Sequence, residues 1–293
     1  MTSNNTAVVV FGSLHYDIIV KGSHRPRKGE TVAGSAWYPK CGGKGGNQAV
    51  SAAKHGVKTA MIGAVADDEF GHALVRNLAD HNVDHRFVRT LKGAASGMSV
   101  AIFDSEGDYG AVFVSGTNLE LGDSDVSEAS GIFGPRSVLV LQNEVADEAN
   151  VAAACAVKQA GGTVLLNAAP ARSPSAALTA LVDIVVVNAV EAEALASIPS
   201  VDSLDTALEA ARILARQYPV AVVTAGGEGV AFVERGGSEK AVAAVKVKLV
   251  STHGAGDEFI GVLAAQIASG ATLETAVAAA NEAAAILVST PRN

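Results

Sequence analysis

The segment with the clearest chemical potential is residues 251–259, which read STHGAGDEF and precede an Ala-rich stretch. Small residues before a helix let backbone N–H groups converge, and the helix dipole adds positive potential, so the segment predicts an anion site. Asp257 lies inside it, where a carboxylate would oppose the anion. It can be a base that takes the proton of a hydroxyl beside a phosphoryl group. It can equally be an ordinary first-turn aspartate that stabilises the helix end, and the residues alone leave both interpretations open.

A second glycine-rich segment, residues 42–49, reads GGKGGNQA. It is not a P-loop, because Gly45 follows Lys44 where Ser or Thr is needed, and it lacks the G-x-G-x-x-G spacing of dinucleotide-binding folds. One interpretation is a loop that lets a ligand approach the backbone, with Lys44 and Asn47 donating hydrogen bonds to hydroxyls. The other is a tight turn into a helix.

Two weaker patterns follow predicted strands. Asn188 and Glu191 are three residues apart, so they could share a helix face and reach a hydrated Mg²⁺ or phosphates. A helix cap explains the same spacing and is the more frequent case. Residues 224–229, TAGGEG, fit either a β-turn or a backbone that wraps a nucleotide.

Short apolar runs alternate with helical patterns along most of the chain. Strands are predicted at residues 7–12, 59–64, 137–141, 163–166, 184–187 and 220–224, and helices at 48–55, 70–79, 147–159, 204–217, 255–268 and 272–288. The alternation predicts an α/β fold, a doubly wound, mostly parallel sheet with helices on both faces. We expect one domain over residues 1–293.

Two segments interrupt this alternation with strands that no helix follows. The first, about 15–43, contains a β-like stretch at 31–37, and the second, about 97–115, reads as a hairpin with its turn at 104–108. Together they predict a small β-sheet lid inserted in the domain.

Composition excludes several classes of protein. The net charge is −8 and no basic block stands out, so a nucleic-acid partner is not expected. Two cysteines are too few for a disulfide framework, and the N-terminus lacks the charged and apolar regions of a secretion signal. We expect a cytoplasmic protein without a membrane partner.

Taken together, these features resemble the ribokinase-type carbohydrate kinases, the PfkB group, over nearly the whole chain and in the right order. The segments at 42–49 and 251–257 match the paired family signatures; further matches are Gly12, Ser13, Asp17, residues 116–118, Gln142, Glu144, residues 167–171 and Asn281. The resemblance implies a ribokinase-like fold and phosphorylation of a hydroxyl of a ribose-like pentose or related carbohydrate, with ATP and Mg²⁺.

The resemblance also implies a role for each matching residue. Asp257 would be the general base, and the backbone N–H groups of Gly254, Ala255 and Gly256 would form the anion hole for the transferred phosphate. The sugar pocket would contain His15, Asp17, Gly43, Lys44, Asn47 and Glu144. The nucleotide would contact Asn188, Thr224, Gly226, Gly229 and Asn281, and Glu191 would reach Mg²⁺ through water. A homodimer that pairs through the lid is implied as well.

Three departures from the family pattern bear on substrate and ions. His15 stands where ribokinases carry Asn and changes one wall of the sugar pocket. Ser251 replaces the leading Asp of the second signature, and the sequence ends after residue 293, before the tail that relatives place beside a monovalent cation. We therefore expect a weak response to K⁺, or none.

Two other functions remain alternatives. One is a nucleoside kinase of the same fold, and the other is a non-catalytic sugar-sensing homologue. The presence of Asp257 with Gly254 and Gly256 argues against the sensor, because a sensor needs no base.

Overall fold

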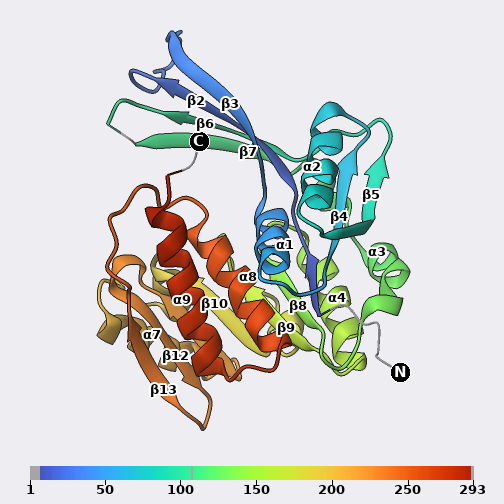
Figure 1. Cartoon of the computed structure of the whole chain (residues 1–293), viewed down its shortest axis with the longest axis vertical. Coiled ribbons are helices and arrows are strands. Elements are labelled where there is room, and N and C mark those ends of the chain that lie inside the picture. The colour runs from blue at the N-terminus through green and yellow to red at the C-terminus, as the bar shows by residue number, and fades with distance from the viewer. Residues whose placement is uncertain (1–6, 107, 292–293) are drawn as a thin grey trace.

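The computed structural model describes residues 7–106 and 108–291, which form a nine-stranded sheet, a four-stranded sheet and the helices around them (Figure 1). The larger sheet has the strand order β13-β12-β11-β10-β9-β8-β1-β4-β5. Its strands are β1 (Val8–Phe11), β4 (Thr59–Ala66), β5 (Asp84–Leu91), β8 (Val138–Gln142), β9 (Thr163–Asn167), β10 (Ile184–Asn188), β11 (Val220–Thr224), β12 (Gly229–Glu234) and β13 (Glu239–Ala243). Neighbours from β5 to β11 pair in parallel, whereas β12 and β13 pair antiparallel at one edge.

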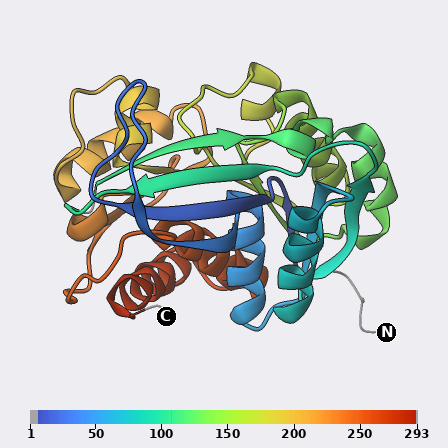
Figure 2. The same cartoon turned by 90° about the horizontal axis from the view of Figure 1, so that it is seen from above.

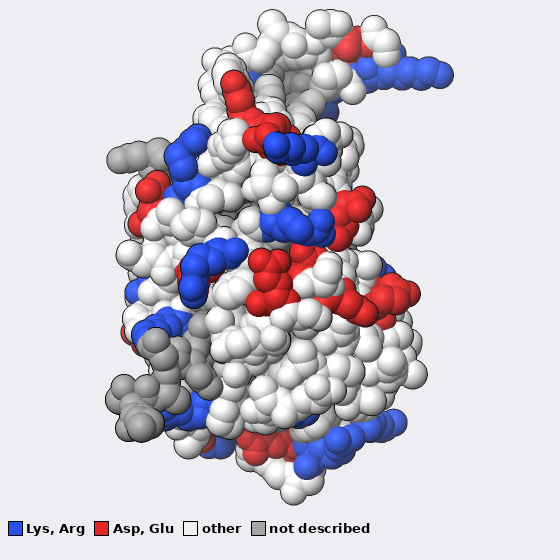
Figure 3. All heavy atoms as spheres, turned by 90° about the vertical axis from the view of Figure 1, so that its right-hand side faces the viewer, with Lys and Arg blue, Asp and Glu red and all other residues white. Residues whose placement is uncertain are grey.

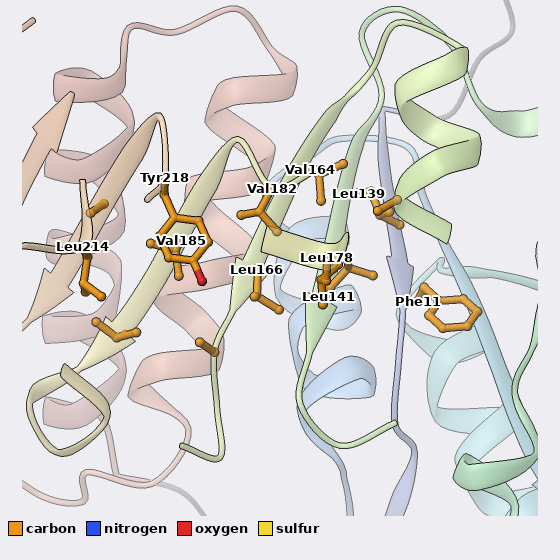
Figure 4. Packing of buried hydrophobic residues seen from close by; sticks show 14 of the residues in the cluster. Phe11, Leu139, Leu141, Val164, Leu166, Leu178, Val182, Val185, Leu214 and Tyr218 are labelled. Carbon is orange, nitrogen blue, oxygen red and sulfur yellow. The ribbon is translucent and has the colours of Figure 1, made fainter. Parts of the chain in front are cut away.

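The central strands are apolar on both faces because helices cover both faces. In β1, Val9 and Phe11 pack into one hydrophobic cluster, and Val8 and Val10 pack into the other. The first cluster, partly shown in Figure 4, lies under α3 (Asp123–Glu128), α4 (Asp147–Gln159), α5 (Ala176–Thr179), α6 (Ala189–Ala196) and α7 (Leu204–Leu214). The second lies under α1 (Lys44–Lys54), α2 (Glu69–Asp80), α8 (Ala255–Ala268) and α9 (Leu273–Ser289). The predicted fold class is confirmed.

The start of α1 differs from the prediction. The helix begins at Lys44 rather than at residue 48, so Gly45 and Gly46 lie in its first turn. A Cβ atom added at Gly45 would lie 2.7 Å from the backbone nitrogen of Ser13, and the Gly46 N–H donates to the Ser13 carbonyl at 3.0 Å. This close tertiary contact outweighs the low helix propensity of glycine, which had suggested a loop.

The four-stranded sheet, which we call the lid, has the order β3-β2-β6-β7. Its strands are β2 (His15–Gly22), β3 (Gly34–Gly42), β6 (Met98–Phe103) and β7 (Tyr109–Val114), and they extend across one side of the larger sheet (Figure 2). The hairpin β6–β7 was predicted, although residue 107 of its turn lies outside the described residues. The strand predicted at 31–37 is confirmed only over residues 34–37, because β3 spans Gly34–Gly42. Its pairing with β2 extends it to Gly42, which the local pattern did not indicate.

The lid joins the site without an intervening helix. Residues 12–14 lead from β1 directly into β2, and β3 ends at Gly42, just before α1. On the face in Figure 3, acidic and basic side chains are interspersed. Within the described residues, every helix is too short or too polar to cross a membrane.

Candidate active site

Four neighbouring parallel strands end in polar residues at the same edge of the sheet. Gln142 ends β8, Asn167 ends β9, Asn188 ends β10 and Thr224 ends β11, and the register pairs Gln142 with Asn167 and Asn188 with Thr224. Ligands of open α/β sheets bind outside the carboxyl ends of the strands. A cavity of about 720 Å³ lies at this edge; its lining includes Lys44, Asn167, Asn188, Glu191, Thr224, Gly254, Gly256 and Asp257.

Asp257 is held by two amides of α1. The Asn47 Nδ2 group donates to Oδ2 at 2.9 Å, and the Gln48 Nε2 group donates to Oδ1 at 3.0 Å. Burial raises the pKa of the Asp257 carboxyl, and the charge of Lys44 and the two amides offset part of that rise. A carboxylate that lines the cavity and has a raised pKa is suited to accept a proton from a hydroxyl.

The predicted anion hole falls at the first turn of α8. Gly254 is the N-cap residue with φ of 80°, and the helix starts at Ala255. The first N–H groups of a helix have no acceptor inside the helix, so they are available to a phosphate. In the structure the Ala255 N–H contacts the Thr252 carbonyl at 3.3 Å, whereas Gly254 and Gly256 line the cavity with Asp257.

Glu144 connects the first strand, the start of α1 and the lid. Its Oε2 atom accepts hydrogen bonds from the Ser13 hydroxyl and from the Lys44 N–H, the latter at 3.1 Å. The Nδ1 atom of His15 lies 3.8 Å from the same oxygen. The predicted sugar residues His15, Lys44 and Glu144 are therefore neighbours.

His15 and Asp17 lie at the base of the lid on β2. His15 is 4% exposed, its ring meets the Phe113 ring edge-on at 6.1 Å, and its Nε2 atom is buried without a hydrogen-bond partner among the described residues. Asp17 accepts a hydrogen bond from the Ser99 hydroxyl, and burial raises the pKa of its carboxyl. Neither side chain lines the 720 Å³ cavity, which lies nearer to Asp257.

Asn188 and Glu191 form a reciprocal helix cap at the start of α6. The Glu191 N–H donates to Asn188 Oδ1 and the Asn188 N–H donates to Glu191 Oε2, each at 2.9 Å. Burial raises the pKa of the Glu191 carboxyl. Because Mg²⁺ in kinases is held mainly by substrate phosphates and water with one or two carboxylates, the cap does not prevent Glu191 from facing such an ion. Glu191 lines the cavity, so the donor set fits a hydrated Mg²⁺.

Three predicted nucleotide residues lie away from this cavity. Gly226 is exposed in a short turn with φ of 54°. Gly229 has φ of 127°, and a Cβ there would lie 2.1 Å from the Val242 carbonyl oxygen, so close strand packing accounts for the glycine. The Asn281 amide donates to the Ala243 carbonyl at 2.9 Å and ties α9 to β13.

Sequence reasoning gave no site role to Ser13, Gln48 and Asn167, although Ser13 and Asn167 were noted as matches to the family pattern. A role for Asn167 could have been inferred, because it is a polar residue at the end of a buried strand, like Asn188. No local signal indicates Gln48, because its partner Asp257 lies 209 residues away in the sequence.

Known proteins resemble this chain in sequence and in fold. The family described as pfkB family carbohydrate kinase matches residues 5–292. A ribokinase of Mus musculus is 33% identical over 264 residues, covering 89% of this chain and 82% of the relative. A deoxyribokinase of Salmonella typhi is 34% identical over 272 residues, covering 92% and 88%. The solved structure of Arabidopsis thaliana ribokinase complexed with ribose and ATP superposes with a TM-score of 0.89 at 26% identity, covering 98% of this chain and 94% of that one.

Proposed function

The chain belongs to the pfkB family of carbohydrate kinases, and we propose that it transfers the γ-phosphate of ATP to a hydroxyl of a ribose-like pentose or related sugar, with Asp257 as the general base. The observation that carries this proposal is the placement of Asp257 in the cavity beside the first turn of α8. The base takes the hydroxyl proton, the sugar oxygen forms the new P–O bond, and the bond to ADP breaks. The N–H groups of Gly254, Ala255 and Gly256 stabilise the charge on the transferred group.

The sugar pocket that we propose extends from Asp257 toward the base of the lid. Asp17, Lys44 and Glu144 would supply acceptors and a cation beside Gly42 and Gly43, and the Asn47 amide donates to Asp257. Asn188 and Thr224 lie at the nucleotide end of the cavity, with Gly226, Gly229 and Asn281 beyond it. Mg²⁺ bound with ATP would neutralise phosphate charge, and Glu191 would hold it through water.

The direct test is an ADP-release assay over pentoses, deoxypentoses, hexoses, sugar acids and nucleosides. We expect turnover of a pentose, and we expect this turnover to require Mg²⁺. K⁺, titrated against choline at constant ionic strength, should stimulate it less than about ten-fold. Ser251 supports the expectation for K⁺, because a serine brings no negative charge to offset dehydration of a bound cation. Nucleosides belong in the screen because a second cavity of about 1130 Å³ lies between the lid and residues 250–253. ADP release with nucleosides alone would contradict the proposal.

His15→Asn should shift the sugar preference toward ribose. The relatives include both ribokinases and a deoxyribokinase, whose sugars differ by one hydroxyl. The buried Nε2 atom of His15 lies near the proposed pocket and has no hydrogen-bond partner in the part of the chain that the structure describes. An amide at this position offers both a donor and an acceptor in a smaller volume. We expect kcat/KM for ribose relative to deoxyribose to rise roughly ten-fold, the effect of about one hydrogen bond. If the two sugars keep their wild-type ratio in the variant, position 15 does not select between them.

We also propose that the protein pairs through the lid as a homodimer. Trp37, Val112 and Val114 are 68%, 72% and 52% exposed, and exposed apolar side chains gathered on one face of a sheet are typical of an interaction surface. A monomeric mass in light scattering would exclude this pairing. The cytoplasmic location stays a prediction.

A further inference from the structure

A chain of buried amides leads from Asp257 into the core. Gln48 and Gln142 are both 0% exposed. Gln48 Nε2 donates to Asp257 Oδ1 at 3.0 Å, and Gln142 Nε2 donates to Gln48 Oε1 at 2.8 Å. The backbone carbonyl of Gln142 accepts in turn from the Asn150 amide at 2.8 Å, which fixes the end of β8.

The charge of Asp257 determines which way each amide points. An ionised carboxylate only accepts hydrogen bonds, so Gln48 must present its NH₂ group, and its carbonyl oxygen must then face Gln142. Gln142 must meet that oxygen with its own NH₂ group, because the opposite orientation would place two carbonyl oxygens against each other.

In this orientation the side chain of Gln142 leaves one buried oxygen atom, Oε1, without a hydrogen-bond partner among the described residues. That oxygen lies 1.8 Å from the position that a Cβ would take at Gly12, so any larger residue there would displace the amide. An unsatisfied buried acceptor is unfavourable, and an arrangement that leaves one calls for a functional explanation.

We infer that Gln48, oriented by Gln142, is a positioning residue for the general base: it fixes the rotation of the Asp257 carboxylate and favours its ionised form. The inference rests on the proposed function. With one lone pair of each oxygen engaged by Asn47 and Gln48, the carboxylate keeps further lone pairs for the substrate hydroxyl. A carboxylate without this support could rotate away from the hydroxyl.

The surroundings of Asp257 explain why this support matters. Burial raises the pKa of the carboxyl, and the charges of Glu144 and Glu191 act in the same direction. The charge of Lys44 and the two amide donors lower it. The other charged or titratable residues that line the adjoining cavities are Lys40, Cys41, Lys54, His81, His253 and Glu258. Removal of the Gln48 donor should leave the carboxyl protonated up to a higher pH, so less base is available at neutral pH.

The test compares Gln48→Met and Gln142→Met with the wild type. Methionine keeps the length of glutamine but lacks the amide, so the first variant removes the donor and the second removes only the group that orients it. For Gln48→Met we expect the acid limb of the kcat/KM–pH profile to move up by on the order of one pH unit, the effect of one hydrogen bond to a charged group. Gln142→Met should move it in the same direction by less. The KM for ATP should stay within about two-fold, and Gln217→Met, an exposed position after α7, is the matched control.

A merely structural role would lower activity equally at every pH and would leave the acid limb in place, which would overturn the inference. A ¹³C NMR titration of aspartate-labelled protein, with the Asp257 signal identified by its loss in Asp257→Asn, measures the same shift without turnover. If the wild type phosphorylates no sugar, the proposed function fails while the titration still tests the inference. If the wild type is active and neither the acid limb nor the carboxyl signal shifts in a folded variant, the inference alone fails.

Discussion

Replacing Asp257 with asparagine is expected to lower kcat by at least ~10²- to 10⁴-fold, the usual contribution of a general base. Asparagine has nearly the same shape, and its carbonyl oxygen can still accept from Gln48, whose NH₂ group is fixed by Gln142. The amide of Asn47 can turn its own oxygen toward the new NH₂ group. The geometry is therefore retained and the basicity is lost. ADP release should fall to this extent, whereas the Kd for ATP, measured by calorimetry, should stay within about two-fold.

The pH dependence gives an independent check of the same assignment. Because burial raises the pKa of Asp257 above its ordinary value near ~3.9, the wild-type acid limb should lie above that pH. The residual activity of the asparagine variant should lack this limb. Activity within a few-fold of the wild type, or an unchanged acid limb, would mean that another group accepts the proton.

The melting temperature of Asp257→Asn distinguishes loss of catalysis from loss of the folded structure. A carboxyl whose pKa is raised by folding destabilises the folded state by the full amount above its folded-state pKa, and this cost declines as the pH falls from there to the unfolded-state pKa. Asparagine carries no such cost. The melting temperature of Asp257→Asn at neutral pH should therefore equal or exceed that of the wild type, and a clear decrease would attribute the lost activity to unfolding.

The parts of the fold that the sequence predicts are those set by local pattern. The buried strands β1 and β8 and the helix α8 follow from continuous apolar runs and helical periodicity, and Asp257 could be singled out because small residues precede it. The start of α1 could not be predicted, because Gly45 and Gly46 are helical only where Ser13 lies against them.

The missing part of the site depends on contacts between distant segments. Gln48 meets Gln142 across 94 residues and Asp257 across 209, so no short window of sequence contains both partners. The pattern of residues 42–49 instead drew attention to Lys44 and Asn47, whose donors were easier to interpret. Of these, Asn47 proves to donate to Asp257, a contact that only the packing of α1 against α8 brings about.

Gly43→Ala is expected to lower both activity and stability, and Gly56→Ala to lower stability alone. Both glycines have φ of 83°, a value that L-residues rarely adopt and that costs them roughly 1–2 kcal/mol in the left-handed helical region. At Gly43 ψ is 134°, outside that region, so alanine is strained further there. The surroundings differ. A Cβ at Gly56 would meet no described residue within 4 Å, whereas a Cβ at Gly43 would lie 2.6 Å from the backbone nitrogen of His15 and 2.9 Å from the Ser13 carbonyl oxygen.

Gly43→Ala should lower activity because Gly43 directly precedes the residues of α1 that hold Glu144 and Asp257. Backbone atoms cannot rotate away as a side chain can, so the new methyl group must push the start of α1 from residues 13–15. That movement breaks the Lys44 N–H bond to Glu144 and shifts Asn47 and Gln48, which hold Asp257. Because a displacement of about 1 Å at reacting groups can cost ~10²-fold, we expect kcat/KM to fall by about that factor. Urea unfolding should show a loss of about 1–2 kcal/mol for Gly56→Ala with activity within two-fold, and a larger loss for Gly43→Ala. Equal activity in the two variants would show that the close approach of Gly43 to residues 13–15 does not position the base.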